Sequence, residues 1–137
     1  MSTSASSASH SSPLAAAKLV AFVAITNPER AKAFYRDKLG LRLVSEDGFA
    51  LVFDGNGTML RASLVREVAH AQYTVLGWEV SDIEGTARNL TDAGITLERY
   101  SFPGQDSLGI WTAPGGVARV AWFKDPDGNT LSISQHS

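Results

Sequence analysis

Short runs of β-branched and aromatic residues, separated by turn signals, extend along most of the chain. Residues 18–25 form such a run, which is too short and too rich in valine for a helix and predicts a strand. Residues 27–29, Asn-Pro-Glu, predict a helix start, because asparagine caps free amide groups, proline suits the first helical position and glutamate favours the positive end of the helix dipole. Gly40 is the predicted helix end. Three strands follow it, at 41–44, 49–53 and 58–65.

The second half of the chain repeats this order of elements. Residues 73–80 predict a strand, Asp82 predicts a helix cap, and Gly94 predicts the end of that helix. Three more strands are predicted at 95–100, 117–123 and 129–134, and a long loop at 101–116 follows the first of them.

The two halves can also be aligned position by position. Matching the helix caps places Val20 opposite Val75, and matching the glycine-containing turns places Leu60 opposite Leu131. The sequence therefore predicts an internal duplication. The alternative is a generic α+β sandwich whose halves match by accident of strand and turn composition.

Two stretches of sequence resemble a known family. FYRDKLGL at 34–41 and DPDGNTLSI at 125–133 closely resemble the two most recognisable stretches of the vicinal oxygen chelate superfamily, the glyoxalase and bleomycin-resistance proteins. The resemblance covers about residues 17–135. It implies an α+β fold in which two βαβββ modules, at about 17–66 and 70–135, form a curved, mostly antiparallel half-barrel of strands with helices outside.

Composition narrows the classes of function. The 137 residues suit one compact domain, expected at 14–137 behind a disordered, serine-rich tail at 1–13. The net charge is -2 at pH 7 and there is no basic run, so no nucleic acid partner is expected. The chain has no cysteine, which excludes disulfides and thiolate chemistry. No apolar stretch is long enough to span a bilayer, so we expect a cytoplasmic protein without a membrane partner.

The resemblance also indicates where a metal ion would bind. Enzymes of the family hold one divalent metal with His, Glu or Gln side chains, and the matching positions in this chain are Val20, Arg61, Val75 and Ser132. Valine has no lone pair, the arginine charge repels a cation, and one serine hydroxyl does not make a metal site. We therefore expect no metal and no other cofactor, which disfavours a metal-dependent glyoxalase or dioxygenase.

A concave surface remains, and strand alternation predicts which side chains line it, because residues at even spacing from the metal positions share their face. The expected ligand-binding residues on this face are Phe22, Arg61, Ser63, Tyr73, Val75, Glu79 and Ser132. Arg61 is suited to hold a ligand carboxylate or phosphate. The alternative, which stays open, is that Arg61 and Glu79 form an internal ion pair that closes the cavity.

The sequence predicts different roles for the three tryptophans. Trp78 and Trp122 lie inside predicted strands, where large aromatic side chains most often pack the core against helices, and alternation points Trp78 away from the cavity. Trp111 lies in the long loop, where binding residues concentrate. We therefore add Trp111 to the expected ligand-binding residues, as a lid over a flat ligand.

Three functions remain open. The favoured one is a metal-free homodimeric module that binds a small, anionic or aromatic molecule, as in the drug-resistance members that this chain resembles. The second is a glyoxalase-like lyase, an isomerase or a dioxygenase-type enzyme for a small carbonyl compound, with Arg61 holding an anion and Glu79 as base. A neighbouring arginine would lower the pKa of Glu79, which opposes that role. The third is a structural or interaction module whose cavity is filled by side chains such as Phe22 and Met59.

Overall fold

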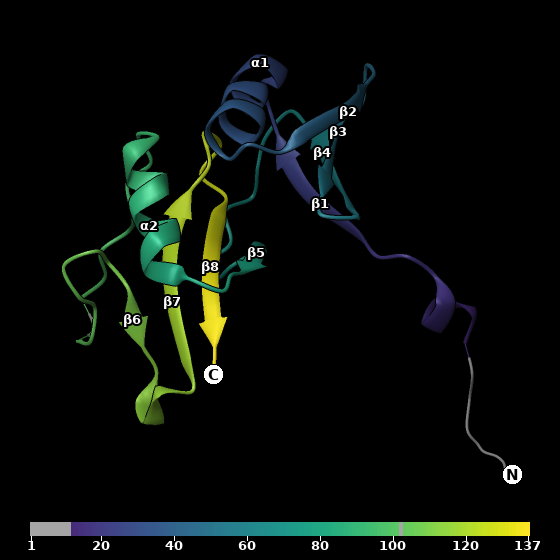
Figure 1. The fold of residues 1–137 in the computed structure, drawn as a ribbon. Coiled ribbons are helices and arrows are strands. Elements are labelled where there is room, and N and C mark those ends of the chain that lie inside the picture. Colours follow the sequence, from purple (N-terminus) through teal and green to yellow (C-terminus); the bar gives the residue numbers. More distant parts are fainter. Residues whose placement is uncertain (1–11, 102) are drawn as a thin grey trace, which may run out of the picture.

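The computed structural model describes residues 12–101 and 103–137, which form two four-stranded sheets with helices packed against them (Figure 1). The predicted tail lies outside the described residues except for its last two positions. Ser12 caps a short 3-10 helix, η1 (Pro13–Ala16), by accepting the N–H of Leu14, and the tail at residues 1–13 stays a prediction.

The first sheet follows the predicted order of one strand, one helix and three strands. Its elements are β1 (Val20–Ile25), α1 (Pro28–Ala31), η2 (Lys32–Lys38), β2 (Arg42–Glu46), β3 (Ala50–Gly55) and β4 (Thr58–Leu64). The second sheet repeats this plan. Its elements are β5 (Leu76–Glu79), α2 (Ile83–Asp92), β6 (Trp111–Thr112), η3 (Pro114–Gly116), β7 (Ala118–Lys124) and β8 (Thr130–His136).

Strand pairing confirms the duplication. The strand orders are β1-β4-β3-β2 and β5-β8-β7-β6, and in each sheet the first and last strands of the repeat pair in parallel while the other pairs are antiparallel. Ala21 pairs with Leu60, and Leu76 pairs with Leu131. In the sequence alignment of the two halves, Ala21 is equivalent to Leu76 and Leu60 to Leu131, so equivalent residues pair in the two sheets. The predicted α+β fold with two βαβββ modules is confirmed.

Both predicted helix starts are also confirmed. The Asn27 side chain accepts the N–H of Arg30 at 3.0 Å, and the Asp82 side chain accepts the N–H of Gly85 at 3.1 Å. After Ala31 the first helix widens to π geometry in η2, and Gly40 follows it with a φ of 79°. This left-handed backbone favours glycine, as expected for a helix end.

The second sheet differs from prediction between its helix and β7. Residues 95–100 form no strand and contribute only the isolated pairing of Leu97 with Phe123. The side-chain amide of Gln105 donates hydrogen bonds to the carbonyl oxygens of Glu98 and Gly109. The side chain thus supplies bonds that a neighbouring strand would otherwise make. The edge strand is instead β6, inside the predicted loop, so Trp111 lies on a strand and pairs with Val120.

One core joins the helices to the inner faces of both sheets. The rings of Phe34 and Tyr35 meet edge to face at 5.0 Å, and Trp78 stacks on Phe123 at 6.3 Å. Trp78 packs against this core, as alternation predicted. Figure 1 shows α2 lying across β7 and β8. The helices within residues 12–101 and 103–137 are all too short or too polar to cross a membrane.

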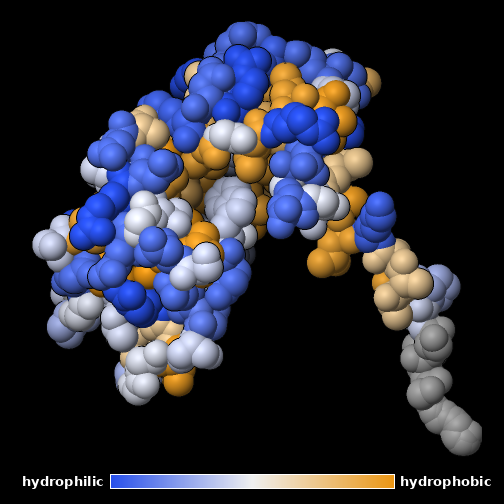
Figure 2. Space-filling view, in the orientation of Figure 1, coloured by the Kyte–Doolittle hydropathy of each residue, from blue (hydrophilic) through white to orange (hydrophobic). Residues whose placement is uncertain are grey.

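The opposite faces of the two sheets border open space. Figure 2 shows the surface hollowed between the lobe of β1–β4 and the lobe of β5–β8, with hydrophobic surface on the first lobe. The candidate functional residues are therefore found on the sheet faces that the helices leave uncovered.

Candidate functional site

Burial alternates along the strands of the first sheet and separates its two faces. On β1, Val23 is buried whereas Phe22 is 60% exposed. On β4, Leu60 and Ala62 are buried, and Arg61 and Ser63 are half-buried on the other face. Phe22 and Arg61 are paired neighbours in the parallel ladder. The structure thus brings Phe22, Arg61 and Ser63 together on the uncovered face, as strand alternation predicted.

The uncovered face of the second sheet carries Trp122. The side chains of Phe123, Leu131 and Ile133 belong to the core, which turns their neighbours outward. Trp122 lies directly opposite Ser132 in the antiparallel ladder of β7 and β8. The prediction that Trp122 packs the core is therefore wrong. The adjacent Phe123 takes the core position, and period-two alternation leaves Trp122 on the other face.

Trp122 borders a cavity of about 840 Å³ on this face, here called the aromatic cavity. The residues lining it are His70, Ala71, Gln72, Tyr73, Tyr100, Trp122, Lys124, Gly128 and Thr130. The rings of Tyr100 and Trp122 meet edge to face at 5.5 Å, and Trp111 lies against Trp122 at 6.2 Å. Tyr73 and Trp111 are thus the predicted site residues that belong to this cavity or to its aromatic wall.

Backbone and side-chain hydrogen bonds hold one wall of the aromatic cavity in place. The ring Nε2 of His70 lies 2.8 Å from the carbonyl oxygen of Asp127, and because a carbonyl can only accept, Nε2 carries the donated proton. The Thr130 hydroxyl donates to the carbonyl oxygen of Ala71 at 3.3 Å. Gly128 has a φ of 82°, and a Cβ there would lie 2.9 Å from His70 Nε2. The wall therefore requires glycine at the turn beneath His70.

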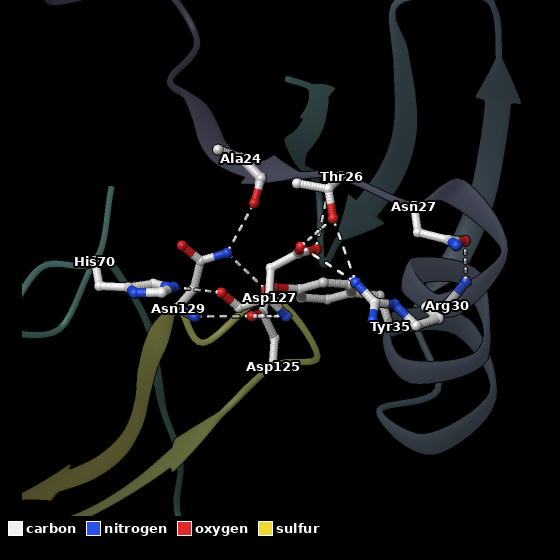
Figure 3. Close-up of polar contacts among 9 residues, drawn as sticks. All are labelled: Ala24, Thr26, Asn27, Arg30, Tyr35, His70, Asp125, Asp127 and Asn129. Carbon is white, nitrogen blue, oxygen red and sulfur yellow. Dashed lines mark hydrogen bonds and ion pairs between the residues drawn. The ribbon is translucent and has the colours of Figure 1, made fainter. Parts of the chain in front are cut away.

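The turn between β7 and β8, which contains Gly128, is anchored by a buried polar network, drawn in Figure 3. Asp125, which is 5% exposed, accepts the Tyr35 hydroxyl at 2.6 Å and the Asn129 side-chain amide at 2.8 Å. Asn129 also donates to the carbonyl oxygen of Ala24 at 2.8 Å. Burial raises the pKa of the Tyr35 hydroxyl, and the neighbouring Asp125 carboxylate raises it further, so Tyr35 remains a proton donor.

Asp127 extends the network to the start of the first helix. Its carboxylate accepts the N–H of Thr26 at 3.2 Å and the Thr26 hydroxyl at 2.5 Å, and it pairs with Arg30 at 3.4 Å. These contacts join the β7–β8 turn to residues that follow β1. Because their partners are other protein groups, they serve to hold the two halves of the chain together.

Glu79 and Arg61 lie apart from one another. The Glu79 carboxylate contacts both the backbone N–H and the ring Nδ1 of His136, and the hydrogen bond from that backbone N–H is the main cause of the lowered Glu79 pKa. Arg61 instead helps to lower the pKa of Asp47, after the N–H groups of Phe49 and Ala50. The structure therefore does not pair Arg61 with Glu79, because their strands lie in different sheets and Glu79 has a nearer partner on the adjacent strand β8.

The four positions at which the family would hold a metal are divided between the sheets. Val20 and Arg61 lie in the first sheet, Ser132 lies in the second, and Val75 immediately precedes β5. Together they offer two aliphatic side chains, one guanidinium and one hydroxyl, which do not fit a divalent metal. Elsewhere in the described part of the chain, no cluster of three or more His, Asp or Glu side chains could hold a metal ion.

Comparisons with known proteins agree with this fold. The sequence profile of the Glyoxalase/Bleomycin resistance protein/Dioxygenase superfamily matches residues 18–133. The search of curated proteins found no significant match.

Several solved structures share the fold. A glyoxalase/bleomycin resistance protein/dioxygenase from Alicyclobacillus acidocaldarius is 18% identical, with a TM-score of 0.68 over 88% of this chain and 91% of that one. TioX from Micromonospora sp. ML1 is 19% identical, with a TM-score of 0.66 over 88% of this chain and 99% of that one. A glyoxalase family protein from Enterococcus faecalis is 22% identical, with a TM-score of 0.65 over 84% and 93% of the two chains. Together with the duplicated fold, the profile match shows that this chain belongs to the Glyoxalase/Bleomycin resistance protein/Dioxygenase superfamily, which is the vicinal oxygen chelate superfamily.

Proposed function

We propose that this protein binds a small aromatic or anionic molecule in the aromatic cavity, using its own side chains and no metal ion. The observation that carries the proposal is the cavity itself, whose volume of about 840 Å³ falls within the range of small-molecule sites. Its lining combines aromatic rings with a few polar groups, which is the usual composition of such sites. The donor set at the family's metal positions supports the metal-free part of the proposal.

The remaining predicted residues take different places in this proposal. Ser132 is buried opposite Trp122 on the neighbouring strand and is not among the residues that line the aromatic cavity, so it supports Trp122 from the adjacent strand. Val75 donates its N–H to the Thr130 carbonyl oxygen at 2.9 Å, which fixes the chain beside the cavity. Phe22, Arg61 and Ser63 belong to the facing sheet and would contact a ligand only across the hollow in Figure 2. We do not assign Glu79 to the ligand, because it is bonded to His136.

Two observations weigh against the other candidate functions. A catalytic base needs a pKa near the working pH, whereas the pKa of Glu79 is lowered and no carboxylate is among the residues lining the aromatic cavity. A module with a filled cavity would bury Phe22 and Met59, but these side chains are 60% and 45% exposed. A binding role agrees with both observations, whereas an enzyme with Glu79 as base and a module with a filled cavity each disagree with one of them.

We extend the proposal to a homodimer. The uncovered face of the first sheet exposes several large hydrophobic side chains, namely Val20, Phe22, Val44 and Met59. Exposed apolar groups that lie together mark interaction surfaces, and a second copy would cover them. Sedimentation equilibrium would give the mass directly. The expectation that the protein works in the cytoplasm stays a prediction.

Thermal unfolding tests the proposed function. In a chelating buffer, several members of a library of small aromatic and carboxylate compounds should raise the melting temperature in a concentration-dependent way, because a ligand that binds only the folded state stabilises it by mass action. Manganese, nickel, zinc, iron and magnesium should give no such shift, and elemental analysis should find no stoichiometric metal. Stoichiometric metal with a shift of several degrees would contradict the metal-free reading, and a library without any stabilising compound would contradict binding.

A further inference from the structure

We infer that the aromatic cavity selects planar aromatic carboxylates over neutral or cationic molecules of the same shape. This inference rests on the proposed function and names the class of ligand. It combines two features of the lining, a set of aromatic rings and a lysine that takes part in no ion pair among the described residues.

The aromatic part of the lining suits a flat ligand. Tyr73 is 71% exposed and Tyr100 is 38% exposed, so both rings present surface to the cavity, and half-buried Trp122 lies between Tyr100 and Trp111. Flat molecules gain from offset or edge contacts with such rings in addition to the area they bury. Trp111 and Trp122 lie on paired strands, which holds their backbone in place before a ligand arrives.

The charge of the lining favours an anion. Among the described residues that line the cavity, Lys124 is the only lysine or arginine, and none is an Asp or Glu. It is exposed, and within residues 12–101 and 103–137 it takes part in none of the ion pairs. Lys124 also lines a second cavity, of about 280 Å³, together with Glu98 and Lys38, and it forms an ion pair with neither of these two residues.

The position of Lys124 on β7 directs its side chain toward the face that carries Trp122. It lies on β7 opposite Thr130, two residues after Trp122, so strand alternation puts the lysine and the tryptophan on the same face. Asp125 follows Lys124 in the sequence, and its carboxylate turns inward to bind Tyr35 and Asn129 in the buried network. A ligand that places its ring against Trp122 can therefore place a carboxylate at Lys124, where a charge-assisted hydrogen bond forms.

Isothermal titration calorimetry with three matched probes tests the inference on the full chain. The probes are 2-naphthoate, the neutral 2-naphthamide and the cationic 2-naphthylmethylammonium, which share one ring system. We expect 2-naphthoate to bind about tenfold or more tightly than the amide, as a hydrogen bond between charged groups predicts, and the cation to bind most weakly. Lys124→Gln should remove most of the preference for naphthoate over the amide.

Lys18→Gln is the matched control, because it removes the same charge from a lysine that does not line the aromatic cavity. It should keep the preference. Equal affinity for naphthoate and amide, or a preference that survives Lys124→Gln, would overturn the inference while leaving binding in the cavity intact. Failure of all three probes to bind, together with no stabilising compound in the thermal screen, would overturn the inference and the proposed function together.

Discussion

Asp125→Ala is expected to lower the free energy of unfolding by about 3–5 kcal/mol, because several buried donors lose their acceptor and each such loss costs roughly 1–3 kcal/mol. The Asp125 carboxylate accepts the Tyr35 hydroxyl, the Asn129 side chain and the backbone N–H groups of Asp127 and Asn129. Alanine leaves these donors without their acceptor in a buried place, and each such donor carries a cost of desolvation. Urea unfolding followed by tryptophan fluorescence measures the loss.

Two further variants make this prediction specific. Tyr35→Phe removes one donor and keeps the carboxylate, so it should cost less, roughly 1–3 kcal/mol, and it is the variant to use if Asp125→Ala does not fold. Asp37→Ala removes an exposed carboxylate whose partner in the described part of the chain is Arg36, and it should change stability by no more than about 0.5 kcal/mol. A loss below about 1 kcal/mol for Asp125→Ala would mean that the network does not hold the two halves of the chain together.

Trp122→Ala is expected to weaken binding of aromatic ligands by roughly 5- to 150-fold, from about 1–3 kcal/mol of stacking per ring. Trp122 lines the cavity and contacts both Tyr100 and Trp111, so its loss also removes support from their rings. Calorimetry with the naphthoate probe gives the ratio.

Trp78→Phe is the control for that experiment, because Trp78 stacks on Phe123 in the core, on the other face of the same sheet. Phenylalanine keeps an aromatic ring there, and the affinity should stay within about twofold. An equal loss of affinity in both variants would indicate that Trp122→Ala acts by weakening the fold, and unchanged affinity in Trp122→Ala would place the ligand elsewhere.

The sequence predicted those features of the fold that depend on local chemistry. The helix caps at Asn27 and Asp82 follow from the ability of their side chains to accept nearby N–H groups. The equivalence of Leu60 and Leu131 follows from repeated turns, and the strand pairing bears it out. The uncovered face that carries Phe22 and Arg61 follows from alternation along β1 and β4.

The candidate site was harder to predict, because it depends on contacts between distant segments. Trp122 and Phe123 are adjacent and both aromatic, so their residue types do not show which one enters the core. Trp122 pairs with Ser132 on the neighbouring strand, and this pairing would have placed Trp122 on the face predicted for Ser132. Gln105 replaces a strand beside residues 95–100, and His136 binds Glu79 across 57 positions of sequence. Neither contact leaves a pattern in the local sequence.

In the cavity wall formed by residues 70–73, the sequence predicted Tyr73 but missed His70, for a related reason. His70 reads as a residue at a strand entrance, yet the β7–β8 turn holds it through the Asp127 carbonyl and leaves space for it at Gly128. The same turn carries the network that binds the first half of the chain, as Figure 3 shows. Stability of the fold and the shape of the aromatic cavity are thus linked through one turn.

The most direct test of a metal-free aromatic cavity uses the three tryptophan indole N–H signals in proton–nitrogen correlation spectra, assigned with single Trp→Phe variants. Chelator-treated protein is titrated with 2-naphthoate. Trp122 and Trp111 lie on the cavity side, and Trp78 packs against the core on the other face, so each signal reports one face of the sheet. We predict that the Trp122 and Trp111 signals shift with ligand while Trp78 stays in place, and that added divalent metal changes nothing. Shifts confined to the Trp78 signal, or a shift of the Trp122 signal that appears only after divalent metal is added, would contradict a metal-free aromatic cavity.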